Sequence, residues 1–125
     1  MQKVLLVGIG GAIGAMLRYL LYLATAKIYN HAFPLTTFLI NLTGCFVMGI
    51  VMTLILEKEY FNNSFRLLFC LGILGGYTAL SAVAYEIIYM VENNKFLLGL
   101  VYGSGTMLLS VLTCGLGVYL VRHWH

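Results

Sequence analysis

The chain has 125 residues, of which 62% are hydrophobic and 9% are charged, and its formal net charge is +3. A soluble domain carries roughly 25% charged residues, so this chain has too few to cover a surface in water. The basic residues form no stripe that would follow a phosphate backbone, which argues against nucleic-acid binding. The length leaves room for one domain, and the composition places that domain in a membrane.

Four apolar segments follow one another along the chain, each long enough to cross the hydrocarbon core, which takes about 20 residues. The connectors between them are short, and two of them contain the turn-forming pairs Asn62-Asn63 and Asn93-Asn94. Short connectors make successive helices antiparallel neighbours. The sequence therefore predicts one all-α membrane domain over residues 1–125, with spans at about 3–26, 34–56, 65–91 and 96–121.

The basic residues near the span ends divide into four on one side and two on the other: Lys3, Lys58, Arg66 and Arg122 against Lys27 and Lys95. By the positive-inside rule this weakly favours an amino terminus in the cytoplasm. The bias is small enough to leave insertion in both orientations open.

The first span combines close-packing glycines with a charge inside the membrane. Gly10 and Gly14 form a small-xxx-small pair that lets two helix backbones approach. Ile13 breaks the GxGxxG pattern of a dinucleotide-binding loop, and no acidic residue occurs before Glu57. Arg18 either has a functional role or a pairing that the fold depends on, or it extends its side chain to the membrane interface.

Polar residues recur within the other three spans. Asn41 either joins two helices or offers its amide NH2 to a passing anion. Gly75-Gly76, followed by Thr78, predicts a break in the third helix that frees backbone carbonyls for a cation, or else a glycine-rich packing face. Tyr102, Thr106 and Ser110 lie at i, i+4 and i+8, so they form a hydroxyl stripe that either hands an anion along or bonds to its own helix.

In this order, these elements resemble the CrcB/Fluc family of small bacterial fluoride channels over essentially the whole chain. The resemblance rests on the run Gly10 to Tyr19, on Asn41-x-x-Gly44, on Gly72-x-x-Gly75-Gly76-Tyr77-Thr78 with Ser81 and Glu86, and on the hydroxyl stripe. It implies an antiparallel, dual-topology dimer in the inner membrane of a bacterium. Two pores along the subunit interface would carry fluoride passively out of the cytoplasm.

The resemblance also implies roles for individual residues. A structural sodium ion at the dimer centre would be held by the backbone carbonyls of Gly75 and Thr78. The anion pathway would comprise Arg18 on its vestibule side, the Asn41 amide, and the hydroxyl-bearing residues Ser81, Tyr102, Thr106 and Ser110.

The sequence departs from the family at two pore phenylalanines, whose places are taken by Leu80 and Val83. Neither side chain offers the positive ring edge that an anion can contact. Two readings follow: a conducting homodimer, or a non-conducting partner that pairs with a paralogous four-helix subunit in a heterodimer.

Other classes fit the residues less well. A small multidrug-type transporter of the same size needs a carboxylate in its first helix, where this chain has Arg18, and Glu86 lies near the far end of the third span. A non-transporting assembly subunit stays open. The sequence shows no nucleophile–base set or carboxylate pair, so we expect no enzyme. Cys45, Cys70 and Cys114 lack CxxC spacing, which favours buried, inert thiols.

Overall fold

The computed structural model describes residues 2–28, 34–59, 61–78 and 80–123. The described chain is helical, and four of its helical segments are long and apolar enough to cross a membrane. These segments cover residues 2–26, 35–56, 63–92 and 96–122. The predicted all-α architecture, with four helical segments able to span a membrane, is therefore confirmed.

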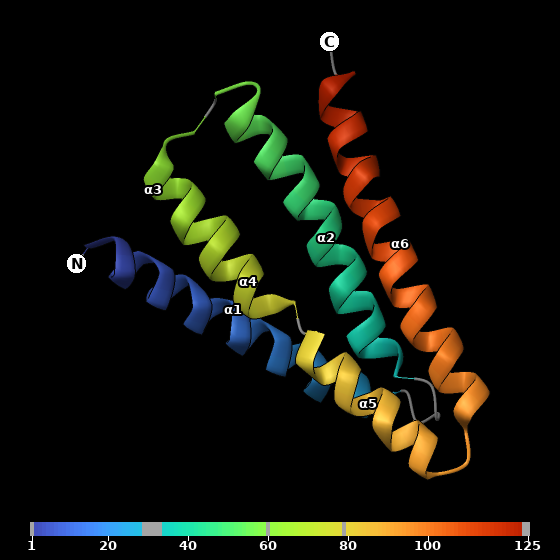
Figure 1. The fold of residues 1–125 in the computed structure, drawn as a ribbon. Helices are drawn as coiled ribbons and strands as arrows, with labels where there is room; N and C mark the ends of the chain where they lie inside the picture. Colours follow the sequence, from blue (N-terminus) through green and yellow to red (C-terminus); the bar gives the residue numbers. More distant parts are fainter. Residues whose placement is uncertain (1, 29–33, 60, 79, 124–125) are drawn as a thin grey trace.

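Three spans are single helices: α1 (Gln2–Ala26), α2 (Leu35–Leu56) and α6 (Phe96–Arg122). The third span is a series of four elements: α3 (Asn63–Phe65), the π-helix η1 (Arg66–Leu74), α4 (Gly75–Tyr77) and α5 (Leu80–Glu92). Figure 1 shows these elements in chain order, with the amino terminus at the left and the carboxyl terminus at the top.

The middle of the third span departs from regular α-helix. η1 has the wider i→i+5 hydrogen-bonding pattern, which is rare and often marks functional sites. α4 ends at Tyr77, and Thr78 has an extended backbone with φ −77° and ψ 155°. Residue 79, on which the predicted break falls, lies outside the described residues, so the break itself stays a prediction.

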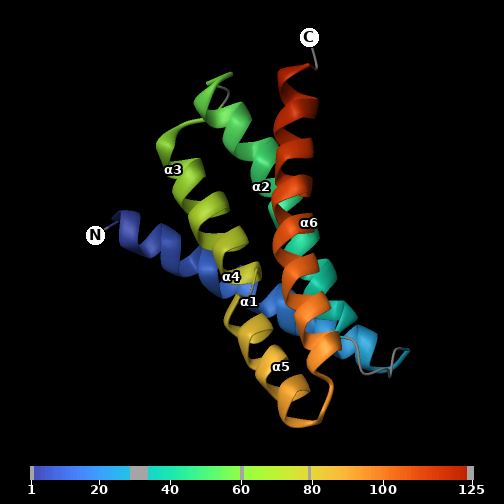
Figure 2. The ribbon, with the colours of Figure 1, turned by 45° about the vertical axis from the view of Figure 1, so that its right-hand side comes forward.

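The bundle consists of two parallel helix pairs. α2 lies along α6, and α1 lies along η1 and α4, as Figures 1 and 2 both show. A Cβ placed on Gly10 or Gly14 would collide with the η1 backbone at Leu68 and Ile73. The small-xxx-small pair therefore makes the backbone contact that its spacing predicted.

The turn between α5 and α6 follows from its asparagines. Asn94 has a left-handed backbone with φ 63°, which asparagine tolerates better than most residues. The Lys95 N–H donates to the Met90 carbonyl at 2.8 Å, and the Asn94 N–H donates to Val91 at 3.2 Å. These two bonds form a Schellman motif, which ends α5 and reverses the chain into α6.

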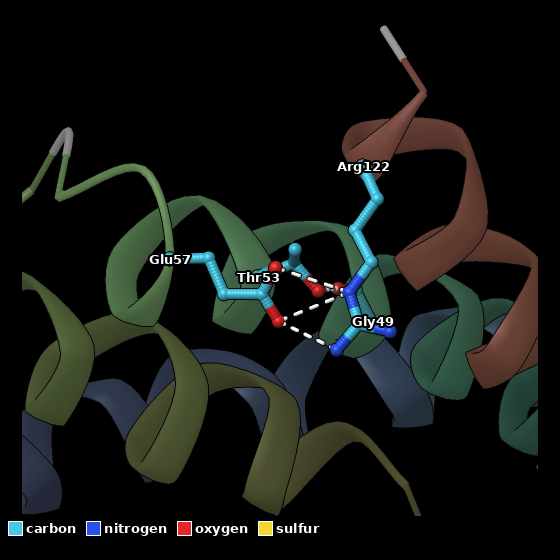
Figure 3. Close-up of polar contacts among 4 residues, drawn as sticks. All are labelled: Gly49, Thr53, Glu57 and Arg122. Carbon is cyan, nitrogen blue, oxygen red and sulfur yellow. Dashed lines mark hydrogen bonds and ion pairs between the residues drawn. The ribbon is translucent and has the colours of Figure 1, made fainter.

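An ion pair fastens α2 to α6 at the end where both helices finish. The Arg122 guanidinium donates to both carboxylate oxygens of Glu57, with Nη2 at 2.6 Å from Oε2 and Nε at 3.0 Å from Oε1 (Figure 3). One turn earlier in α2, the Thr53 hydroxyl donates to the Gly49 carbonyl at 2.7 Å. The hydrogen bond from Arg122 holds the pKa of Glu57 below its ordinary value.

The glycine contact gives a first prediction. Gly14→Ala should lower the stability of the detergent-solubilised protein by about 1–3 kcal/mol, because the new methyl group displaces the η1 backbone. Gly8→Ala, in the same helix, is the matched control, because a Cβ there meets nothing within 4 Å. Thermal unfolding followed by circular dichroism compares the two. Equal melting temperatures would show that α1 and η1 do not pack this closely.

The ion pair gives a pH prediction. Because the folded-state pKa of Glu57 is lowered, the pair stabilises the fold above the unfolded pKa of about 4.3 and loses this effect as pH falls through the folded value. The melting temperature of the native protein should exceed that of Glu57→Gln at neutral pH, and the difference should vanish in acid. Both side chains are exposed, so the difference should be small and should shrink in high salt. A difference that grows on acidification would contradict the pairing.

Candidate functional site

A groove of about 240 Å³ lies between α2, α6 and the region where α4 gives way to α5. Its lining combines polar and apolar side chains from these elements: Asn41, Cys45, Thr78, Leu80, Val83, Gly103, Thr106, Met107 and Ser110. No charged side chain is among these residues. The structure thus brings together Asn41, Thr78, Leu80, Val83, Thr106 and Ser110 from the candidates predicted from sequence.

Two hydroxyl groups in this groove stand out from the other polar groups. Thr106 Oγ1 and Ser110 Oγ are buried, and neither has a hydrogen-bond partner among the described residues. Leaving a buried hydroxyl unpaired costs about 1–3 kcal/mol on the evidence of mutational data. The two groups lie one helical turn apart on α6 and line the same groove, so they can donate hydrogen bonds to a guest there.

The Asn41 amide belongs to the same groove. Its side chain is 7% exposed, and Nδ2 donates to the carbonyl of Thr37 at 3.1 Å. An amide nitrogen carries two N–H donors, and this bond occupies one of them. Asn41 therefore combines a bond to its own helix with a place in the groove lining.

Tyr102 is directed differently from the other two residues of the hydroxyl stripe. Its side chain is fully buried, and its hydroxyl donates to Glu86 Oε1 at 2.8 Å. It is absent from the groove lining that contains Thr106 and Ser110. α6 packs against both α2 and α5, so different parts of its surface meet different neighbours.

Glu86 is the acceptor at the centre of a hydroxyl network within the membrane. Besides Tyr102, the Thr37 hydroxyl donates to Glu86 Oε2 at 3.0 Å. Because Thr37 has a single hydroxyl proton, the bond that joins it to the Tyr22 hydroxyl must be donated by Tyr22. The chain of bonds thus runs from Tyr22 through Thr37 to Glu86 and connects α1, α2, α5 and α6.

Arg18 and Ser81 lie together in a second groove of about 460 Å³, which they share with Tyr19 and Tyr22. Arg18 is half-buried there rather than enclosed. Since Tyr22 also joins the network at Glu86, this groove lies next to that network. The structure thus pairs Arg18 with Ser81, apart from the groove of Asn41 and Thr106.

The two positions that depart from the family pattern differ in burial. Leu80 is 73% exposed at the edge of the first groove, and Val83 is 4% exposed. Val83 packs with Met90 and Tyr102 in a small core cluster. A larger side chain can therefore be added at Leu80 without repacking, whereas at Val83 it would disturb the core.

The two residues expected to offer carbonyls lie at the two ends of α4. Gly75 begins this element, and Thr78 follows its last residue with an extended backbone. The Thr78 N–H donates to the Leu74 carbonyl at 3.0 Å, and its hydroxyl donates to the same oxygen at 3.1 Å. The Thr78 side chain is thereby fixed against its own helix while the main chain leaves it.

The family resemblance and the multidrug-type alternative both pointed to Glu86, but neither predicted the network around it. Two signals were present. Glu86 is the single acidic residue in the predicted span 65–91, and a carboxylate at that depth needs partners. In addition, Tyr22 and Thr37 flank the first connector, so an antiparallel hairpin brings them together.

The fold and these grooves define a small, multi-pass helical membrane protein with uncharged hydrogen-bond donors lining a groove along two helices. Residues 5–118 match the family described as "CrcB-like protein, Camphor Resistance (CrcB)", and the chain belongs to this family.

Relatives cover nearly the whole chain. A "Fluoride-specific ion channel FluC" of Synechococcus sp. (strain JA-2-3B'a(2-13)) is 38% identical over 94% of this chain and 91% of its own length. Proteins with the same name from Rhizobium meliloti (strain 1021) and Sulfurihydrogenibium sp. (strain YO3AOP1) are 37% and 34% identical, each over 98% of both chains. The predicted family resemblance is therefore confirmed, and its named function is that of an ion channel rather than an enzyme.

The unpaired hydroxyls give a prediction on stability. Thr106→Val should raise the melting temperature in fluoride-free buffer, because it removes a buried hydroxyl without a partner and keeps the side-chain shape. Thr53→Val is the matched control, since Thr53 is equally buried but its hydroxyl is bonded to Gly49. That variant should lose about 0.5–1.5 kcal/mol. If both variants were destabilised alike, the Thr106 hydroxyl would have a partner in the folded protein.

Proposed function

We propose that this chain is a subunit of a fluoride channel that lets fluoride leave the cytoplasm passively. The single observation that carries the proposal is the pair of unpartnered buried hydroxyls, Thr106 Oγ1 and Ser110 Oγ, in a groove that also contains the Asn41 amide. The name of the relatives supports the choice of ion.

The chemistry of this groove suits a small anion. Fluoride is strongly hydrated, so a pathway must replace its water with hydroxyl and amide donors. Donors that already have partners within the protein would have to give them up first. Thr106 and Ser110 have none among the described residues, and no carboxylate in the groove lining repels an anion.

A second subunit completes this proposal. The groove of one chain is open on one side, and a chain of this size cannot enclose a pore alone. We infer an antiparallel dual-topology dimer in the bacterial inner membrane, with one pore along each side of the subunit interface. The large apolar side chains exposed along α1, such as Ile9, Met16 and Leu20, would lie against lipid or the second subunit.

The proposed dimer also includes a structural sodium ion. The extended backbone at Thr78 fits this role, because a carbonyl next to an interrupted helix can turn away from the helix axis toward a cation. Gly75 and Thr78 would supply two carbonyl oxygens from each subunit. Within the described residues, no group of three His, Cys, Asp or Glu side chains offers another metal site. Bound there, the ion would supply positive charge that ties the subunits together.

The second candidate is a non-conducting subunit that completes a heterodimer with a paralogous chain. The observation that favours it is the aliphatic character of Leu80 and Val83, which line the groove without offering a positive ring edge. In such a heterodimer the paralogue would supply the aromatic rings.

Fluoride efflux from liposomes tests the proposal and separates the two candidates. The chain is purified alone, reconstituted into liposomes loaded with potassium fluoride, and triggered with valinomycin while an electrode records external fluoride. A conducting homodimer is identified when fluoride efflux is faster than efflux from protein-free liposomes and falls at least tenfold in Thr106→Val/Ser110→Ala. Liposomes loaded with potassium chloride should show no matching chloride efflux. No efflux alone but efflux after co-reconstitution with a paralogous subunit identifies the partner role. Absence of efflux in both preparations would overturn the channel proposal.

The aliphatic groove residues give a further prediction. Leu80→Phe should increase fluoride flux in the dimer that conducts, because it adds a positive ring edge at an exposed position of the groove. Adding Val83→Phe should increase flux further, at the cost of stability, since Val83 lies in the core cluster. Leu80→Met is the control, because it changes the shape without adding a ring. An unchanged rate in Leu80→Phe would show that ring edges play no part here.

A further inference from the structure

A third groove, of about 410 Å³, lies at the end of the bundle where α1 and the third span begin. It is lined by two basic, one amide and three aliphatic side chains: Lys3, Arg66, Asn63, Val4, Val7 and Leu67. None of them lines the grooves around Asn41 or Arg18.

The polar part of this groove is suited to an anion with several oxygens. Lys3 comes from α1 and Arg66 from η1, so two positive charges converge from different helices. Arg66 Nε donates to Asn63 Oδ1 at 3.1 Å, which orients the guanidinium and uses one of its five N–H donors. An Arg held in this way presents its fork to phosphate oxygens with little loss of side-chain freedom.

The electrostatic surroundings favour an anion as well. No carboxylate is among the groove-lining residues. The Glu57 carboxylate is paired with Arg122, and neither residue lines this groove (Figure 3). Lys3 and Arg66 therefore keep an uncompensated positive charge among the residues that form this groove.

The aliphatic part of the groove points to an amphipathic ligand. Val4 and Val7 lie one turn apart on α1, and Leu67 follows Arg66 on η1, so apolar side chains continue from the charged end into the membrane-spanning part. A free inorganic anion would leave these side chains unused. A phospholipid places its phosphate at the depth of Lys3 and Arg66 and an acyl chain along the valines.

We propose that this groove binds the phosphate group of an anionic phospholipid, with Lys3 and Arg66 as its charged ligands and Val4, Val7 and Leu67 as the acyl-chain wall. The inference does not depend on the ion that the protein conducts. Lipid bound there would join α1 to the start of the third span, at the end of the bundle opposite the Schellman turn.

Thermal unfolding of the purified full chain in dodecyl maltoside tests this site. Short-chain phosphatidylglycerol should raise the melting temperature in a saturable manner, and phosphatidylcholine of the same chain length should not. Lys3→Gln/Arg66→Gln should weaken the apparent affinity for phosphatidylglycerol about thirtyfold. Each basic residue near an anionic lipid contributes about 1 kcal/mol of attraction, and the loss of about 2 kcal/mol corresponds to this change in affinity.

Three comparisons make the result decisive. Lys27→Gln/Lys95→Gln removes the same charge outside this groove and should leave the lipid response unchanged. Lys3→Arg keeps both charges and leaves the Arg66 guanidinium in place, so it should retain most of the response. Inorganic phosphate and glycerol phosphate should give no shift at the concentrations that saturate the lipid effect. An equal response to inorganic phosphate, or an undiminished lipid response in Lys3→Gln/Arg66→Gln, would overturn the proposal.

Discussion

A hydroxyl buried in a membrane protein has no water to bond with, and this constraint organises the structure. Most polar side chains inside the described helices satisfy it within the protein: Thr53 bonds to Gly49, Asn41 to Thr37, and Tyr102 to Glu86. Thr106 Oγ1 and Ser110 Oγ are also buried, but they have no partner within the part of the chain that the structure describes. Leaving two buried donors unpaired costs folding free energy. A permeating anion that accepts their hydrogen bonds would explain why the protein keeps them.

The bonded polar groups and the unpaired donors have different roles: the bonded groups hold the helices together, and the unpaired donors line the groove. Thr37 and Glu86 hold α1, α2, α5 and α6 together at one end, and the Glu57–Arg122 ion pair joins α2 to α6 at the other. Between these two attachments, Asn41 of α2 lines the same groove as Thr106 and Ser110 of α6.

Much of the fold could be predicted from the spacing of charges, because lipid penalises a charged side chain wherever it lies in a span. Gly10 and Gly14 likewise revealed a helix contact, since only backbone can approach where side chains are missing. The separation of Tyr102 from Thr106 could not be predicted, because a stripe on one helix does not say which neighbour each turn meets. The same holds for the π-helix over Arg66–Leu74, for which the sequence offers no local signal.

Solid-state NMR with fluoride and 13C-labelled threonine tests the central claim, that Thr106 and Ser110 donate to an anion, most directly. Dipolar recoupling between 19F and 13C should attenuate the Cβ signal of Thr106, and the attenuated signal should disappear in Thr106→Val. Thr53, whose hydroxyl is bonded to Gly49, should keep its full intensity. A Thr106 signal unaffected by fluoride, in a preparation that conducts the ion, would contradict the role of these hydroxyls.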